Sequence, residues 1–322
     1  MINRIVVSLV LVMCSFCVYG TNENGQIAVD TSYMITIGGI QQYVKIKGDD
    51  EQNPLLLYLH GGPGQSVMSK ADALTSDLQK HFLVVHWDQR GAGETLNFNS
   101  EDQTLSIDQM KQDAEEVVQY LLSTYSIDKI VIVGHSWGTV LGFHLANALP
   151  DHIAAYIAIS PVINSLQSQE IALRKLKAYY KEKDNEKALA QLATVSVPPD
   201  NLEQMIIQYR WQTSFDGEEV TDEQVEQAMP FFTQWEARWG AIEKEIVKIN
   251  MFEELKSLSC PVYFFIGSND YQTNFTVAQD YFELLKAPTK KLFWFKESAH
   301  NVPDTQGTLM QDIIINEILP TL

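Results

Sequence analysis

The stretch Gly134-His135-Ser136-Trp137-Gly138 decides the fold. An apolar run typical of a buried strand, 130–133, precedes it, and helix-like sequence over 139–149 follows it. A serine between two glycines at a strand-to-helix junction has the sequence form of a nucleophile elbow, a turn so tight that its corner residue is strained. The flanking positions must be small because strand and helix pass close to each other. The pattern predicts that Ser136 projects its hydroxyl from the top of a sheet.

Short apolar runs separated by helical sequence continue on both sides of this motif. Gly38-Gly39 separates two runs, 33–37 and 41–46, which predicts a hairpin. Further strands are expected at 55–59, 82–87, 153–159, 261–266 and 291–295, and helices at 106–124, 276–285 and 308–318. Such alternation favours an α/β fold with a mostly parallel central sheet and helices on both faces.

The alternation stops at Pro161. From there to about residue 255 the sequence is charged and helical, with helices expected at 169–180, 185–192, 201–212 and 222–249. Pro198-Pro199, Gly217 and Pro230 are expected to interrupt it. The predicted organisation is therefore a core made of residues 21–160 and 256–322, with a helical cap inserted at residues 161–255.

The first residues have the pattern of a secretory signal peptide. Arg4 precedes an uncharged run from Ile5 to Tyr19, and polar residues follow Gly20. An uncleaved anchor is the alternative, but the run is shorter than the roughly 20 residues that span a bilayer. We expect residues 1–20 to be a signal peptide and the product to be secreted or periplasmic. A lipoprotein is less favoured because bulky residues precede Cys14 and Cys17.

Length and composition exclude several classes of protein. The chain has 322 residues, 45% of them hydrophobic, which is enough to fill a sizeable core. Its formal net charge of −18 repels phosphate backbones, so we expect no nucleic-acid partner. Cys260 is the single cysteine outside the predicted signal, so the mature chain forms no internal disulfide. Beyond the signal no membrane segment is expected, and the sequence does not determine the oligomeric state.

A serine hydroxyl needs a base and an orienting acid to act as a nucleophile near neutral pH. Asp270 follows the expected strand 261–266, and His300 follows the expected strand 291–295. Because the carboxyl ends of parallel strands meet at one edge of a sheet, both side chains are expected to reach Ser136 there. Helix capping is the alternative role for Asp270. His135, inside the elbow, is expected to pack or hydrogen-bond behind the serine.

Oxyanion stabilisation requires backbone N–H groups aimed at developing charge. The N–H of Trp137, directly after the nucleophile, is one candidate. The other comes from His60-Gly61-Gly62-Pro63-Gly64, a glycine-rich loop that follows the expected strand 55–59. An ordinary Gly/Pro turn is the alternative for this loop. Arg90, after the expected strand 82–87, is expected to brace loops near the site rather than to take part in catalysis.

Three motifs together resemble those of the proline iminopeptidase family of α/β-hydrolases. They are the loop at 60–64, Asp88-Gln89-Arg90-Gly91-Ala92-Gly93, and the elbow extended to Thr139. The resemblance implies an α/β-hydrolase fold with a helical cap and a serine exopeptidase that releases an N-terminal residue, often proline. It makes Ser136 the nucleophile, Asp270 the orienting acid, His300 the general base and acid, and Gly62 with Trp137 the oxyanion donors.

The resemblance also assigns substrate-binding residues. Cap glutamates of such enzymes bind the α-amine of the substrate, and Glu236 lies in a similar Trp-Glu element, although a solvated carboxylate is the alternative. Gly61 is the second expected substrate-binding residue. The expected partner is a small peptide or acyl substrate, and no cofactor or metal site is expected because the sequence has no metal-ligand motif. An esterase or amidase of the same fold and a non-catalytic binding protein remain alternatives.

Overall fold

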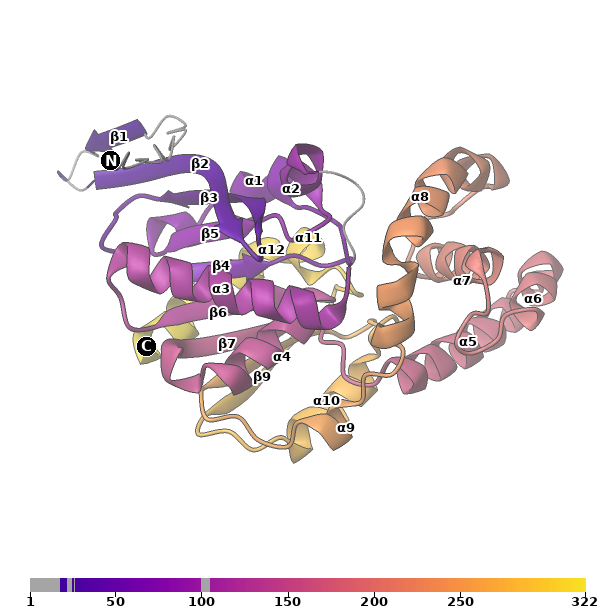
Figure 1. Cartoon of the computed structure of the whole chain (residues 1–322). Coiled ribbons are helices and arrows are strands. Elements are labelled where there is room, and N and C mark those ends of the chain that lie inside the picture. The colour runs from indigo at the N-terminus through magenta and orange to yellow at the C-terminus, as the bar shows by residue number, and fades with distance from the viewer. Residues whose placement is uncertain (1–17, 22–24, 26, 100–104) are drawn as a thin grey trace, which may run out of the picture.

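The computed structural model describes residues 18–21, 25, 27–99 and 105–322. Among these residues, nine strands form one sheet in the order β1-β2-β3-β5-β4-β6-β7-β8-β9 (Figure 1). The strands are β1 (Val18–Thr21), β2 (Ile27–Ile37), β3 (Ile40–Gly48), β4 (Leu55–Leu59), β5 (Leu83–Trp87), β6 (Ile130–His135), β7 (Ile153–Ile159), β8 (Val262–Gly267) and β9 (Lys290–Phe295). The pairs from β1 to β5 across this order are antiparallel, and those from β5 to β9 are parallel. The predicted mostly parallel sheet is confirmed.

The central strands are apolar along their whole length because helices cover both faces of the sheet. In β4 every side chain is buried, and successive residues join different clusters. Leu55, Leu57 and Leu59 lie in the cluster on one face, and Leu56 and Tyr58 lie in the cluster on the other. Strands covered on both faces are expected to be continuously hydrophobic rather than alternating.

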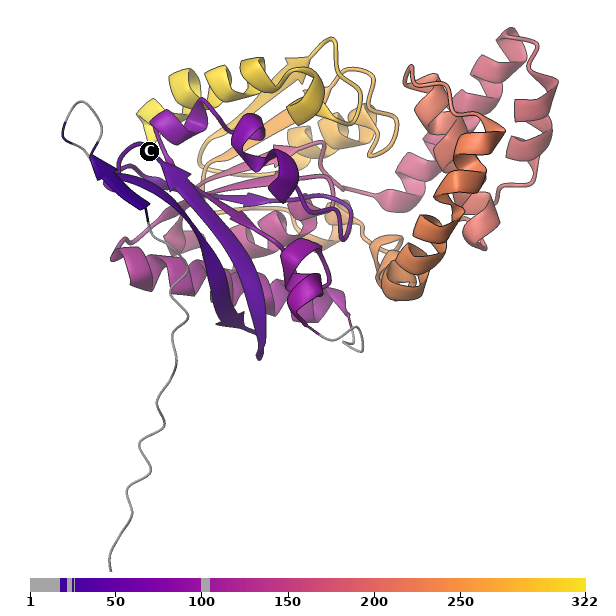
Figure 2. The same cartoon turned by 90° about the horizontal axis from the view of Figure 1, so that it is seen from above.

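Helices lie on both faces of the sheet (Figure 2). On one face are α3 (Ile107–Tyr125), α4 (Gly138–Ala148) and α10 (Phe275–Leu284). On the other are α1 (Ala71–Leu74) and α12 (Gly307–Ile313). The helix predicted at 308–318 changes geometry part-way, because a π-helical turn, Ile314–Ile318, replaces its second half. The short helices α2 (Gly93–Phe98), α9 (Met251–Glu254) and α11 (Val302–Thr305) lie in the connections.

The inserted region between β7 and β8 is helical and stands beside the sheet (Figures 1 and 2). It contains α5 (Ser165–Glu182), α6 (Glu186–Ala193), α7 (Leu202–Phe215) and α8 (Asp222–Ile246). Part of it has a hydrophobic cluster of its own, made of Leu173, Leu176, Tyr180, Ala188, Leu192, Val195 and Trp211. We call α5 to α8 the cap.

Helix α8 continues through Pro230, where an interruption was predicted. A proline inside a helix leaves one backbone carbonyl without its usual donor. That carbonyl belongs to Glu226, which is exposed, so water can satisfy it. A capping box at Thr221 and Gln224 begins the helix, and buried Trp239, Ile242 and Ile246 fix its second half. Tertiary packing and capping therefore outweigh the cost of the proline.

The second half of α8 attaches the cap to the loops at the carboxyl edge of the sheet. The indole Nε1 of Trp235 donates to the carbonyl of Pro63 at 3.1 Å. Trp239 lies so close to Gly64 that a Cβ on that glycine would be 2.4 Å from its indole nitrogen. Glycine at position 64 therefore lets the loop after β4 pack directly against α8.

The predicted signal peptide lies outside the described residues except for 18–20, which belong to β1. Its cleavage stays a prediction. In the part of the chain that the structure describes, no helix combines the length and the hydropathy needed to cross a membrane. Cys260 is buried and has a free thiol, whose pKa is raised to about 11 by burial.

Candidate active site

Ser136 lies at the junction between β6 and α4 with a positive φ of 52°. This left-handed backbone turns the chain sharply from strand into helix. A Cβ on Gly134 would be 2.7 Å from the carbonyl oxygen of Gly138, and a Cβ on Gly138 would be 2.1 Å from that of Leu59. Both distances are too short for a side chain, so the elbow requires glycine at both positions.

The three predicted catalytic side chains lie together at the carboxyl edge of the sheet. Ser136 follows β6, Asp270 follows β8 and His300 follows β9. The Nε2 atom of His300 is 2.9 Å from the Ser136 hydroxyl oxygen, and its Nδ1 atom is 3.0 Å from Oδ2 of Asp270. All three side chains are buried. The arrangement lets Nδ1 donate to the carboxylate while Nε2 accepts the serine proton.

Asp270 is held as a carboxylate by its surroundings. Burial by itself would raise its pKa, but the charge and hydrogen bond of His300, together with Thr273, bring the pKa below its usual value. The backbone N–H groups of Gln272 and Thr273 and the Thr273 hydroxyl donate to the carboxyl at 2.9, 3.0 and 2.8 Å. These donors fix the carboxylate in the orientation in which it accepts from His300.

The backbone of His300 is also fixed. Its carbonyl accepts a hydrogen bond from the Ser160 hydroxyl at 2.8 Å and lies 3.2 Å from Nε2 of His135. Burial lowers the pKa of His135 to about 4, so this ring is neutral near pH 7. His135 therefore contacts the back of the site, as expected from its position in the elbow.

The loop that follows β4 passes beside the nucleophile. A Cβ on Gly61 would be 3.3 Å from the Cβ of Ser136, and Gly62 has a φ of 119° that favours glycine. Trp137 immediately precedes the first residue of α4. The structure thus brings the glycine loop to the elbow, and the donor roles of Gly62 and Trp137 stay predictions.

Arg90 connects separate parts of the core. Its guanidinium makes two hydrogen bonds to the carboxylate of Asp113 on α3, at 2.7 and 2.9 Å, and one at 2.9 Å to the carbonyl of Gly38 in the β2–β3 turn. Both side chains are buried. Arg90 therefore braces the base of its loop, in agreement with the predicted role, although the main partner is a carboxylate.

The structure does not bring Glu236 into contact with the triad. Glu236 is exposed on α8, and its side chain forms no hydrogen bond or ion pair among the described residues. Its predicted role in substrate binding stays a prediction.

Two other cap carboxylates, missed by sequence reasoning, have perturbed acidity. Asp216 is exposed at the end of α7, and desolvation by the surrounding protein raises the pKa of its carboxyl to about 6; this carboxyl also interacts electrostatically with Asp270 and His300. Burial raises the pKa of Glu243 to about 7. Glu236 and Glu243 are seven residues apart on α8 and share a helix face, a spacing that could have drawn attention to Glu243. Asp216 follows α7 without a motif around it, so nothing in the sequence singles it out.

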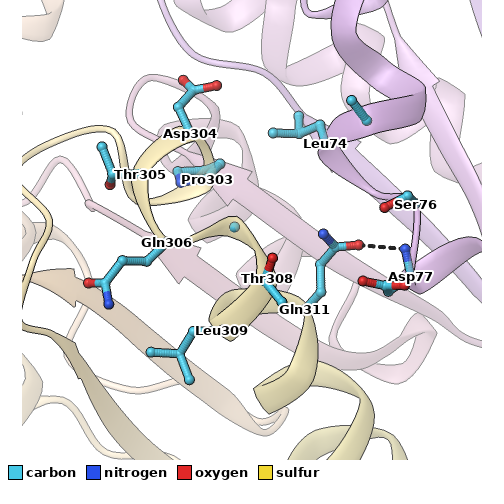
Figure 3. Close-up of a pocket in the computed structure, with 12 residues that line it drawn as sticks. Leu74, Ser76, Asp77, Pro303, Asp304, Thr305, Gln306, Thr308, Leu309 and Gln311 are labelled. Carbon is cyan, nitrogen blue, oxygen red and sulfur yellow. Dashed lines mark hydrogen bonds between the residues drawn. The ribbon is translucent and has the colours of Figure 1, made fainter.

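No group of three or more His, Cys, Asp or Glu side chains within the described ranges is placed to hold a metal ion. A surface cavity of about 460 Å³ lies elsewhere, between α1 and the segment carrying α11 and α12 (Figure 3). Its lining includes Leu74, Asp77, Asp304 and Gln311.

Comparison with known proteins decides the family, since residues 54–270 match the family described as alpha/beta hydrolase fold. The chain belongs to the α/β-hydrolase fold family. The hydrolase is 27% identical over 283 residues to a probable aminopeptidase, YbaC, of Bacillus subtilis (strain 168), covering 83% of this chain and 89% of that protein. It is 26% identical over 285 residues to a proline iminopeptidase of Heyndrickxia coagulans, covering 82% and 89%. These relatives confirm the resemblance that the three motifs indicated.

Among solved structures, the crystal structure of VinJ superimposes with a TM-score of 0.67 at 17% identity. The match covers 91% of this hydrolase and 99% of that chain. At so low an identity the likeness shows the shared fold alone.

Proposed function

We propose that this hydrolase is a serine aminopeptidase that acts through an acyl-enzyme on small peptides. The observation that carries the proposal is the continuous hydrogen-bonded series from the Ser136 hydroxyl through His300 to Asp270. A serine hydrogen-bonded to an imidazole that a buried carboxylate orients is the arrangement required for acyl transfer. The aminopeptidase and the proline iminopeptidase named above align with this chain over most of their length, and they support the proposal that it is a peptidase.

In the proposed mechanism the Ser136 oxygen attacks the carbonyl carbon of the scissile bond while Nε2 of His300 takes the hydroxyl proton. Asp270 stabilises the resulting imidazolium. The carbonyl oxygen becomes an oxyanion and accepts hydrogen bonds from the N–H groups of Trp137 and Gly62. The C–N bond then breaks as His300 returns the proton to the leaving amine. Water, deprotonated by His300, attacks the acyl-enzyme in the same way and releases the free N-terminal residue.

The cap is proposed to recognise the α-ammonium group of the substrate. The resemblance assigns this role to Glu236, and the electrostatic interaction of Asp216 with the triad makes it a second candidate. With a pKa of about 6, Asp216 is ionised above that pH and attracts a cation. An α-amino group loses its charge above about pH 8. Binding through Asp216 is therefore expected to be strongest between about pH 6 and 8.

The test compares prolyl and other aminoacyl arylamides with acyl esters that have no amine. We expect wild-type protein to hydrolyse the arylamides, Ser136→Ala to be inactive, and a fluorophosphonate to label Ser136. Turnover of esters alone would contradict the peptidase proposal and indicate an esterase of the same fold. Absence of labelling in folded protein would favour a non-catalytic binding protein.

Substitution of the cap carboxylates identifies the amine ligand. Asp216→Asn, Glu236→Gln and Glu243→Gln each remove one charge with little change in shape. Loss of a hydrogen bond to a charged group costs about 1.5–3 kcal/mol, so the variant that lacks the ligand should lose about 10- to 100-fold in kcat/KM for arylamides. Its ester hydrolysis should be unchanged. If arylamide hydrolysis is equal in all three variants, the amine is bound elsewhere.

We also propose that residues 1–20 direct export. Cleavage after Gly20 would remove residues 18–20 of β1 and leave β2 as an edge of the sheet. Mass spectrometry of protein recovered outside the cytoplasm should give an N-terminus at Thr21. A retained N-terminus would contradict cleavage.

A further inference from the structure

Gln89 lies at the carboxyl edge of the sheet, two residues after β5, and its exposed fraction is 0%. Its amide connects two segments that border Ser136, the loop after β4 and the start of the elbow helix α4. The Nε2 group donates to the backbone carbonyl of His60 at 3.0 Å. The Oε1 atom accepts from the indole Nε1 of Trp137 at 2.9 Å. One side chain therefore holds the first residue of the glycine loop and the residue after the nucleophile.

The backbone of Gln89 adds a third contact, which orients the imidazole of His60. The Gln89 N–H lies 3.3 Å from Nε2 of His60, and Nδ1 of the same ring lies 2.9 Å from the carbonyl oxygen of Gly61. Burial lowers the pKa of this histidine to about 4, so the ring is neutral and has one N–H. Because Nε2 accepts from Gln89, Nδ1 has the hydrogen and donates to Gly61.

This hydrogen bond fixes the peptide group that contains the N–H of Gly62. In a planar trans peptide the C=O and the N–H point in opposite directions. When His60 holds the carbonyl of Gly61, the direction of the Gly62 N–H is determined as well. Gln89 thus acts on both candidate oxyanion donors, on Gly62 through His60 and on Trp137 through its indole.

We propose that Gln89 is the positioning residue of the oxyanion hole. The inference rests on the proposed function, because it needs an oxyanion to form beside Ser136. Gln89 does not touch the reacting atoms, and it sets the separation and direction of two N–H groups that belong to different loops. A misplacement of about 1 Å in such groups can reduce the rate about 100-fold. The opposing explanation is that Gln89 only satisfies buried polar groups and so contributes to stability alone.

The test replaces Gln89 by leucine, which keeps most of the volume and removes the side-chain hydrogen bonds. The matched control is Gln311→Leu. Gln311 is also buried, and its Oε1 accepts from the N–H groups of Asp77 and Leu78 at 2.8 and 3.2 Å, far along the chain from the elbow (Figure 3). Each substitution removes two hydrogen bonds of a buried amide, so both should lower the melting temperature.

For Gln89→Leu we expect kcat to fall about 10- to 100-fold while KM changes less than about threefold, since the hole acts on the transition state. The inhibition constant of an α-amino boronic acid, which forms a tetrahedral adduct with Ser136, should rise by a similar factor. The pH profile of kcat/KM should keep its shape because the hydrogen bonds within the triad are unaltered. Gln311→Leu should retain wild-type kcat.

A kcat for Gln89→Leu close to that of Gln311→Leu, or an unchanged boronic-acid inhibition constant, would overturn the proposal. If Gln89→Leu does not fold, Trp137→Phe decides, because it removes the indole donor and keeps an aromatic ring. It should lower kcat with little change in KM, and an unchanged kcat overturns the inference. Where both single variants fold, the double variant should lose no more than Gln89→Leu alone, since Trp137→Phe removes a hydrogen bond that Gln89→Leu has already broken.

Fluorophosphonate labelling separates this inference from the proposed function, because it needs the oxyanion hole and no substrate amine. If the wild-type protein is labelled at Ser136 but hydrolyses no arylamide, the aminopeptidase proposal fails. Slower labelling of Gln89→Leu would still support the positioning role. Labelling of that variant at the wild-type rate would refute it.

Discussion

Replacement of Ser136 by glycine is expected to give a more stable protein than replacement by alanine, although we expect both variants to lack hydrolytic activity. The backbone φ at this position is +52°. A left-handed conformation costs an ordinary residue about 1–2 kcal/mol, and glycine is free of this cost. Glycine loses about 0.5–1 kcal/mol more conformational entropy on folding than alanine does. The net difference in the free energy of unfolding should therefore be about 0.5–1 kcal/mol in favour of glycine.

The comparison between these two variants isolates the backbone, because both lack the hydroxyl that bonds to His300. A matched control is Ala237→Gly, on the exposed surface of α8. There the same exchange of alanine for glycine should destabilise by about 1 kcal/mol. Urea titration followed by circular dichroism measures both differences. If alanine at position 136 is as stable as glycine or more so, the elbow is not strained and the reasoning is wrong.

Three further changes test other parts of the structure. Arg90→Met should lower the free energy of unfolding by about 3–5 kcal/mol because it leaves the buried Asp113 carboxylate without its ion-pair partner. Arg174→Met, in an exposed ion pair, should lower it by less than about 1 kcal/mol. Equal losses in urea titration would refute this prediction. Burial lowers the pKa of His86 from 6.5 to about 3, so the unfolded chain binds a proton that the folded protein does not, and stability should fall as pH decreases through that window. His86→Leu should flatten this part of the stability profile, and an unchanged slope would contradict the assignment. Gly138→Ala should prevent folding because its Cβ would be 2.1 Å from a backbone oxygen. At the control position Gly240, only a flexible side chain approaches a new Cβ, at 3.3 Å, so Gly240→Ala should raise the melting temperature slightly. Comparable expression and stability of both variants would count against the tight elbow.

The features that local sequence determines were predictable. Residues 55–59 and 153–159 were expected to be strands, and they coincide with β4 and β7 because continuous apolar runs are typical of strands covered on both faces. The positions of Asp270 and His300 could also be inferred, since parallel strands place their carboxyl ends along one edge. The elbow motif and the two strand ends were therefore enough to predict that these side chains meet Ser136.

Side-chain contacts between distant segments that neither a motif nor a strand end marks were not predictable. Gln89 and its partner His60 are 29 residues apart in sequence, and Arg90 and its partner Asp113 on α3 are 23 residues apart. The raised pKa of Asp216 comes mainly from desolvation by the segments packed around it, and less from the charges of the triad. Nothing in the local sequence reports such desolvation. The prediction that Pro230 interrupts the helix was wrong for a related reason, because capping and packing elsewhere in α8 maintain the helix.

The attachment of the cap through the second half of α8 has an evolutionary consequence. Trp235 and Trp239 contact the loop that borders the nucleophile, whereas α5, α6 and α7 contribute to a hydrophobic cluster of their own. Substitutions among the members of that separate cluster can accumulate with little effect on the triad side chains. A lineage could thus exchange one substrate for another through many small steps while the rate of bond cleavage is preserved. The α8 contacts would change last.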